Sequence, residues 1–299
     1  MLPIVDTHLH LWDLTRFSLP WLAWDGMELL RKSYLMSHYL ETTAESNVAR
    51  AVYMEVDVDP AQREAETALV IEMCQWDDNP MAGAVIGGSL GEVGFRAYVS
   101  QYRDNDYIKG VRQVLHVPQV ERGRCLGADF VRDVQLLGEL GMSFDLCVRP
   151  SELGDAVDLV GQCPDTLFIV DHCGIANVQI VNGSAEHDPA NAFSHTREQW
   201  QRDIAVLGQQ EHVVCKISGV VESAPEGWGA ETLAPVVNHC LDSFGPDRVV
   251  FAGNWPVCTL GGASFGAWAS ALREIISGRP EEEQAQLLAG NAERLYGLV

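Results

Sequence analysis

The 299-residue chain is predicted to fold as one (β/α)8 barrel. Three observations predict this fold: eight short apolar runs rich in β-branched residues, amphipathic stretches of helical period between most of them, and polar residues directly after several runs. Strands that alternate with helices form a parallel sheet, and eight such repeats close into a barrel. Because barrels of about 250 residues or more commonly form one domain, residues 1–299 are expected to be a single domain.

The eight apolar runs are the expected strands. They are Leu2–Val5, Arg50–Val56, Ala82–Ile86, Ile108–Leu115, Met142–Val148, Thr166–Val170, His212–Ile217 and Arg248–Ala252. A doubly wound open sheet is the structural alternative. That fold would place a glycine-rich phosphate turn after the first strand, where this chain has Asp6-Thr7-His8-Leu9-His10.

Helices are expected between these strands, and Pro80, Pro164 and Pro246 each end one before the next strand begins. The expected helices are Ala61–Gln75, Ala128–Leu140, Glu152–Gly161, Arg197–Leu207, Glu231–Ser243, Phe265–Gly278 and Glu281–Leu288. Residues 12–37, rich in tryptophan, and residues 174–196, rich in Gly, Asn, Ser and Pro, are long insertions after strands. We expect both at the carboxyl-terminal mouth, where barrel active sites lie.

The charge balance excludes two classes of partner. The formal net charge is −22, with 42 acidic and 20 basic residues. Nucleic acids and anionic membrane surfaces require clustered Lys and Arg, so neither is an expected partner. A small anionic substrate stays compatible, because the local field of a site can oppose the net charge. We therefore expect a small-molecule substrate, and the sequence leaves homo-oligomer formation open.

The N-terminus and the cysteines indicate the compartment. The first residues, MLPIVDTHLH, lack a basic stretch followed by an apolar run, so no secretory signal is expected. No window offers about 18 uninterrupted apolar residues, so no membrane span is expected. The eight cysteines are scattered without a C-x-x-C pair, which favours reduced, buried thiols over disulfides or a cysteine metal site. We expect a cytoplasmic protein.

Three histidines follow expected strands. His8 and His10 are two residues apart at the end of the first strand, so both imidazoles point to one face. Neutral imidazole suits zinc, although an H-x-H pair alone is a weak signal and the placement after the first of eight strands strengthens it. His172 follows the sixth strand on the side of Phe168 and Val170. It is a candidate for the same site, and the alternative is a histidine that anchors the following loop.

Position 254 ends the eighth strand. Its side chain follows those of Val250 and Ala252, and the small Ala252 leaves room in the barrel. Asparagine at this position can bind a metal or form hydrogen bonds, but it cannot accept a proton from water.

Cations end three other strands, and tryptophans flank the presumed mouth. Arg112, Arg149 and Lys216 would form a site for an anionic or carbonyl-bearing ligand if they point into one mouth. The alternative for each is a structural ion pair with Asp145 or Asp171. Tryptophans near the mouth are either core residues or the apolar wall of a ligand pocket. They are Trp12, Trp21, Trp24 and Trp255, and His116 is a further candidate for the wall.

Seven segments resemble the amidohydrolase superfamily, and within it the amidohydrolase 2 branch of sugar and aromatic-acid lactonases. They run in the expected order over nearly the whole chain, and together they are specific for the branch. The segments are Val5–Asp13, Gly110–Gln113, Phe144–Pro150, Asp171–Gly174, Cys215–Gly219, Phe251–Cys258 and Gly290–Arg294.

The resemblance implies the opening of a lactone of a sugar acid, or of a related carboxylated lactone, by water. One divalent metal, expected to be zinc, would be held by His8, His10 and His172, although some members of the branch need no metal. The fifth-strand histidine of binuclear relatives has no counterpart in Cys147-Val148-Arg149, so a second metal is not expected. Asn254 departs from the family pattern, which has aspartate there.

The expected mechanism is attack of water on the lactone carbonyl. The metal, or His172 with the cations, would polarise that carbonyl. Arg112, with Arg149 or Lys216, would bind the substrate, and Trp255 would line its pocket. A carboxylate at position 254 would deprotonate the water, so Asn254 suggests an inactivated form that Asn254→Asp should activate about 10²-fold. We favour an introduced substitution over natural loss, because the other motifs are intact.

Two other functions remain open at this point. One is a metal-dependent decarboxylase, a class found elsewhere in the same superfamily. The other is a catalytically silent relative that binds a ligand without turnover, which is motivated by Asn254.

Overall fold

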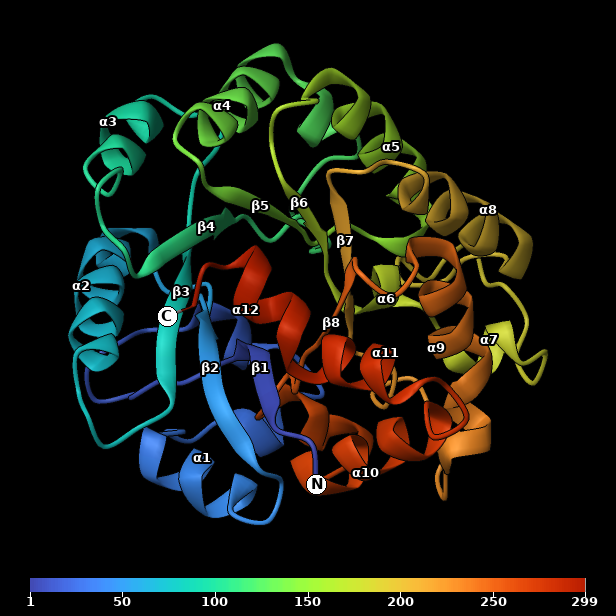
Figure 1. Ribbon diagram of the computed structural model, residues 1–299. Coiled ribbons are helices and arrows are strands. Elements are labelled where there is room, and N and C mark those ends of the chain that lie inside the picture. The colour runs from blue at the N-terminus through green and yellow to red at the C-terminus, as the bar shows by residue number, and fades with distance from the viewer. Residues whose placement is uncertain (299) are drawn as a thin grey trace.

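The computed structural model describes residues 1–298, and it has eight strands at its centre with helices around them (Figure 1). The strand order is β1-β2-β3-β4-β5-β6-β7-β8, and every neighbouring pair is parallel. Leu9 and Trp255 form a parallel bridge between the two edge segments, and the His10 amide donates to the Trp255 carbonyl at 2.9 Å. The sheet is therefore a nearly closed barrel, and the predicted (β/α)8 fold is confirmed.

The strands and helices alternate along almost the whole chain. The strands are β1 Ile4–Leu9, β2 Val48–Met54, β3 Met81–Gly87, β4 Ile108–Arg112, β5 Ser143–Leu146, β6 Phe168–Val170, β7 Val213–Ile217 and β8 Val249–Phe251. The helices are α1 Met36–Thr43, α2 Arg63–Cys74, α3 Phe95–Ser100, α4 Ala128–Glu139, α5 Leu153–Gln162, α6 His172–Ile175, α7 Val178–Val181, α8 Arg197–Gly208, α9 Ala230–Phe244, α10 Phe265–Ile275, α11 Glu281–Ala285 and α12 Asn291–Leu295.

Strand β1 extends further than its apolar residues predict. The expected strand ended at Val5, whereas β1 continues through Asp6, Thr7 and His8, all of which are buried. Their polar groups have internal partners: Asp6 Oδ1 accepts from the Gly253 amide at 2.7 Å, and Thr7 Oγ1 donates to the Phe251 carbonyl at 2.7 Å. Polar residues can occupy a buried strand because these hydrogen bonds offset the cost of burial.

The two ends of the barrel differ. Inward side chains of several strands, Val5, Val52, Val85 and Val250 among them, pack with Tyr296 and others from the C-terminal segment. Figure 1 shows α12 lying across this end of the barrel. Asn291 Nδ2 donates to the carbonyl of Val249, the first residue of β8, at 2.8 Å. Helix α12 therefore covers the amino-terminal end, and the carboxyl-terminal end stays open for a site.

The described residues contain eight free cysteines, all buried, in agreement with the expected thiols. Among residues 1–298, no helix has both the length and the apolar character that crossing a membrane requires.

Candidate active site

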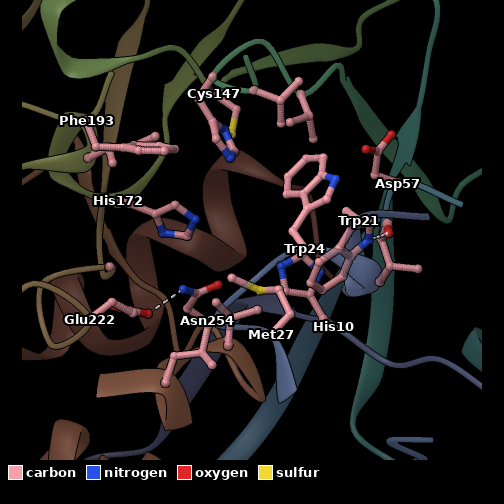
Figure 2. A pocket seen from close by; sticks show the side chains of 18 of the residues that line it. His10, Trp21, Trp24, Met27, Asp57, Cys147, His172, Phe193, Glu222 and Asn254 are labelled. Carbon is pink, nitrogen blue, oxygen red and sulfur yellow. Dashed lines mark hydrogen bonds between the residues drawn. The ribbon is translucent and has the colours of Figure 1, made fainter. Parts of the chain in front are cut away.

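A cavity of about 570 Å³ opens at the carboxyl-terminal ends of the strands (Figure 2). Both long insertions contribute to its wall, as the sequence predicts: Trp21 and Trp24 come from residues 12–37, and Phe193 comes from residues 174–196. The lining also includes residues that follow the strands, among them His10, Arg112, His116, His172 and Asn254.

His8 and His10 converge, as their spacing predicts. Their Nε2 atoms lie 3.1 Å apart. The Nδ1 atom of His10 lies 3.0 Å from the Met54 carbonyl, so the proton sits on Nδ1 and the Nε2 lone pair is free to bind a ligand. Burial lowers the pKa of both histidines, and the Arg112 charge lowers that of His10 further. Both rings are therefore neutral, the state in which imidazole binds metals.

His172 reaches the same cluster from a left-handed turn. The φ angles of His172, Cys173, Gly174 and Ile175 are 55°, 52°, 69° and 53°, a region that non-glycine residues rarely adopt. This turn places the His172 ring 4.4 Å from the His8 ring, between centroids. Its Nδ1 lies 2.9 Å from Ser218 Oγ, and burial lowers its pKa to about 4. Strain of this kind is concentrated at functional sites.

Asp171 joins these histidines, a position that the sequence assigned only to ion pairing. Its Oδ1 lies 3.5 Å from His8 Nδ1. One ligand atom each from His8, Asp171 and His172 lie within 4.8 Å of one another. His10 contacts this group through His8. His8 therefore belongs both to the His8–His10 pair and to the group with Asp171 and His172.

Arg112 borders the cavity but is already held by carboxylates. Its Nε donates to Glu55 Oε1 at 2.6 Å, and its Nη2 donates to the Glu55 carbonyl at 2.8 Å. Its Nη1 lies 3.3 Å from His8 Nε2 and 3.4 Å from Asp171 Oδ2. Burial lowers the pKa of Arg112, but the two carboxylates outweigh it and hold the pKa above its usual value. Sequence reasoning missed Glu55, although an acidic residue at the end of an apolar run carries the same signal as Arg112.

Lys216 does not reach the cavity, in contrast to its predicted role. Its ammonium group lies between Asp145 and Asp171, with Nζ 3.2 Å from Asp171 Oδ1, and the side chain is 0% exposed. These carboxylates raise the pKa of Lys216 against the effect of burial. The alternative interpretation, a structural ion pair, describes Lys216.

Arg149 also points away from the cavity. Its Nε donates to Glu152 Oε1 at 2.8 Å, and its two Nη atoms donate to the carbonyls of Val117 and Val120 at 2.8 and 2.9 Å. Its partner is thus neither Asp145 nor Asp171 but an acidic residue three positions later. Arg149 thus holds the segment after β4 and is not among the residues that line the cavity.

Trp255 belongs to the core and not to the pocket wall. It is 3% exposed, and its ring lies 5.3 Å from Tyr34 and 5.5 Å from Tyr39, between centroids. Asn254 lines the cavity, whereas the Trp255 ring packs in the surrounding core.

Asn254 has a partner that the sequence did not reveal. Its Nδ2 donates to Glu222 Oε1 at 2.6 Å, and Figure 2 shows this bond at the edge of the cavity. Glu222 lies in the loop between β7 and α9, five residues after the strand ends. Burial raises the pKa of Glu222, and the hydrogen bond from Asn254 opposes this effect. Nothing in the local sequence predicts that Glu222 returns to the strand ends.

The charges and the donor atoms fit one divalent metal ion. Three carboxylates (Glu55, Asp145, Asp171) face two cations (Arg112, Lys216), which leaves one negative charge beside neutral histidines. Asp171 Oδ1 makes no well-oriented hydrogen bond within the described chain, although Lys216 Nζ lies 3.2 Å from it. A zinc ion would be held by His8 together with His10, or by His8 together with Asp171 and His172. At the end of β5, Cys147 Sγ lies 3.0 Å from His116 Nδ1.

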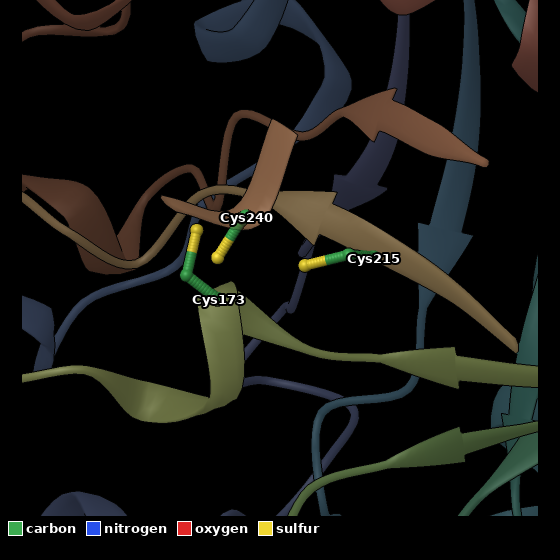
Figure 3. A group of neighbouring side chains, drawn as sticks. All are labelled: Cys173, Cys215 and Cys240. Atoms are coloured by element: carbon green, nitrogen blue, oxygen red, sulfur yellow. The ribbon is translucent and has the colours of Figure 1, made fainter. Parts of the chain in front are cut away.

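Three buried thiols form a group (Figure 3). The Sγ atoms of Cys173, Cys215 and Cys240 are within 4.8 Å of one another. All three residues are 0% exposed, and two of the thiols lie 3.7 Å from the Lys216 carbonyl. Burial raises the pKa of Cys215 and Cys240, whereas hydrogen bonds from these two thiols lower the pKa of Cys173.

A parallel barrel with histidines, aspartate and arginine at the carboxyl ends of its strands has the architecture of a barrel hydrolase. The family model described as amidohydrolase, of the amidohydrolase 2 type, matches residues 5–298. The chain therefore belongs to the amidohydrolase 2 family.

Known proteins resemble the chain over its whole length. The L-fucono-1,5-lactonase of Burkholderia multivorans is 28% identical over 302 residues, covering 98% of this chain and 96% of the lactonase. Protein y4mH of Sinorhizobium fredii is 26% identical over 313 residues, 98% of either chain. A zinc-bound amidohydrolase structure from Burkholderia multivorans aligns with a TM-score of 0.84 at 25% identity, covering 99% of this chain and 100% of that one.

Proposed function

We propose that this amidohydrolase opens an uncharged sugar-acid lactone by adding water to the carbonyl carbon of the lactone. The observation that carries the proposal is the cavity itself, where neutral imidazoles and Arg112 meet beneath a wall of aromatic side chains. The similarity to an L-fucono-1,5-lactonase over nearly the whole chain supports the same reaction.

The chain supplies several groups for this reaction. His172 and Arg112 line the cavity, and Arg112 Nη1 lies beside His8. Both side chains can therefore donate a hydrogen bond to the lactone carbonyl oxygen and orient it. A divalent metal, when bound, would polarise the carbonyl as a Lewis acid. Trp21 and Trp24 offer flat apolar surfaces to the C–H face of a sugar ring.

The charge of the cavity favours a neutral lactone over a carboxylated one. Asp25, Asp57 and Glu222 line it, whereas Arg112 is its one lining Arg or Lys within the described chain and is already paired with Glu55. With Arg149 and Lys216 turned elsewhere, a substrate carboxylate would meet repulsion and little compensation. Carboxylates readily accept hydrogen bonds from sugar hydroxyls.

A panel of lactones tests the proposal. The purified chain, with and without added zinc, is incubated with aldono-1,4- and 1,5-lactones and with a pyrone dicarboxylate, and acid release is followed. We expect the highest kcat/KM on an aldonolactone and at least tenfold less on the dicarboxylate. CO₂ release without ring opening would support the decarboxylase instead. Tight binding without turnover on every member would support a silent ligand-binding protein.

A further inference from the structure

The proposed hydrolysis requires a group that takes a proton from the attacking water, and position 254 cannot provide it. Asparagine has no basic lone pair on its amide nitrogen, and its oxygen is a very weak base. The Asn254 amide is also fixed: a carboxylate only accepts hydrogen bonds, so the Nδ2 group must face Glu222 Oε1 and the side-chain oxygen must face away from it.

Glu222 supplies a carboxylate on the cavity wall beside position 254. It lines the cavity next to Asn254, and the bond between them is 2.6 Å long. Its second oxygen, Oε2, is shielded from solvent and has no hydrogen-bond partner within residues 1–298. A buried carboxylate oxygen without a donor is costly, so a water or substrate hydroxyl that reaches Oε2 when the cavity is filled would stabilise it.

No cation neutralises Glu222 within the described chain. The Cys173 thiol from α6 and the Cys258 thiol from the segment after β8 are among its titratable neighbours. A carboxylate that is not committed to an ion pair keeps its basicity, unlike Glu55, Asp145 and Asp171, which bind Arg112 and Lys216.

We propose that Glu222 is the general base of this active site, replacing the carboxylate that position 254 lacks. The inference rests on the proposed lactone hydrolysis. The water oxygen bonds to the lactone carbonyl carbon while one water proton moves to Glu222. When the tetrahedral intermediate collapses, the ring C–O bond breaks, its electron pair stays on the ring oxygen, and Glu222 returns the proton to that oxygen. The product is the open hydroxy acid.

Asp57 is the alternative carboxylate on the cavity wall. Figure 2 shows it on the opposite side from Glu222, beyond Trp21 and Trp24. Unlike Glu222, Asp57 makes no hydrogen bond to Asn254 within the described residues. Asp57→Asn therefore provides a matched test of the competing assignment.

The pairing of an amide with a carboxylate suggests an exchange experiment. Glu222→Gln leaves an oxygen that can still accept from Asn254, so the fold and KM should persist while kcat falls about 10²-fold or more. The double variant Glu222→Gln/Asn254→Asp moves the carboxylate to the other member of the pair. It should recover kcat to within about tenfold of the wild type, because a remaining tenfold loss is smaller than the whole general-base contribution. Asn254 has a φ of 52°, which aspartate also tolerates, so the exchange is compatible with the backbone.

Asn254→Asp alone gives a different result from the one expected from the sequence. It would place two carboxyl groups at hydrogen-bond distance, and such a pair shares one proton because both cannot ionise readily. We therefore expect no 10²-fold activation, and the acidic limb of the kcat profile should move to higher pH. Glu226→Gln, an exposed change in the same loop, is the control and should match the wild type.

Each outcome decides between the assignments. Loss of kcat in Glu222→Gln with recovery in the double variant establishes the base. Wild-type kcat in Glu222→Gln, no recovery in a folded double variant, or a larger loss in Asp57→Asn than in Glu222→Gln overturns it, while lactone hydrolysis by the wild type stands. If Glu222→Gln does not fold, Glu222→Asp must retain more kcat than Glu222→Ala. A wild-type chain that opens no lactone overturns both proposals.

Discussion

At the scale of single residues, the site is organised by buried charges of opposite sign. Arg112 and Lys216 are almost fully buried, and both contact Asp171, the residue that also approaches His8. A buried charge is tolerable when it is paired, and it becomes costly when its partner is removed. Burial lowers the pKa of the histidines, and the same cations lower it further, so the charges at the strand ends help to keep the imidazoles neutral.

Arg112→Met tests this coupling. The change leaves Glu55 and Asp171 without their guanidinium partner, so the free energy of unfolding should fall by about 3–5 kcal/mol. Urea denaturation followed by circular dichroism measures it. Arg103→Met, an exposed position without an ion pair, is the control and should change stability by about 0.5 kcal/mol or less. A fully stable Arg112→Met would mean that Arg112 is mainly a substrate ligand, as the sequence alone suggested.

Zinc binding is the second prediction at this scale. Elemental analysis of zinc-saturated protein should find at most one zinc per chain, because the strand-end cluster offers one excess negative charge and one group of neutral histidines. At a free zinc concentration 100 times the Kd, the folded state should gain about 2.7 kcal/mol, measured as a rise in Tm.

His8→Ala should abolish the zinc-dependent rise in Tm, whereas His187→Ala, an exposed histidine, should leave it unchanged. Two zinc ions per chain, or an undiminished rise in His8→Ala, would contradict the single site.

At the scale of elements, the loop between β7 and α9 determines the site as much as any strand. Gly219 in this loop has a φ of 67°, and a Cβ there would lie 2.3 Å from His172 Cβ. The glycine thus lets the loop pass against the His172 ring, with Ser218 bonded to that ring and Glu222 beside Asn254. The loop connects two of the proposed active-site groups.

Gly219→Ala should therefore disturb the site in two ways: its Cβ would collide with His172, and its backbone would be strained at a positive φ. Gly227 in the same loop has a φ of 76° but open space around it, so Gly227→Ala carries the strain without the clash. We expect Gly219→Ala to lower kcat by about tenfold or more and to cost more stability than the roughly 1 kcal/mol of Gly227→Ala. Equal effects of the two substitutions would show that the contact with His172 is unimportant.

The elements also show what a sequence can predict. Helices α4 and α8 begin where the periodicity predicts, at Ala128 and Arg197, because an amphipathic face is a local property. Strand β1 was underestimated because its polar residues are satisfied by distant partners such as Gly253. The left-handed turn at His172 was not expected either, since its conformation depends on surrounding packing.

The site residues follow the same rule. Strand ends can be located from apolar runs, and the structure brings His8, His10, His172 and Arg112 into one cluster, with Asn254 on the wall of the same cavity. Whether a strand-end cation faces the cavity depends on its neighbours, and the local partner Glu152 diverts Arg149. Glu222 follows a turn in a long loop, where no periodicity indicates the direction of a side chain.

At the scale of the whole molecule, the barrel separates stability from chemistry. Its amino-terminal end is closed by α12 and apolar side chains, whereas its carboxyl-terminal end carries the cavity and the paired charges. The net charge of −22 and the acidic lining of the cavity have the same sign. Both disfavour anionic substrates, which agrees with a neutral lactone as the substrate of the proposed reaction.

The most direct test follows the oxygen atom of the attacking water. The purified chain with zinc is incubated with L-fucono-1,5-lactone and related aldonolactones in H₂¹⁸O, and the products are analysed by mass spectrometry over time. We expect ring opening well above the spontaneous rate, with one ¹⁸O atom in the carboxylate of the hydroxy acid. Ring opening at the spontaneous rate for every aldonolactone, or enzyme-dependent products without ¹⁸O in the carboxylate, would rule out the proposed hydrolysis.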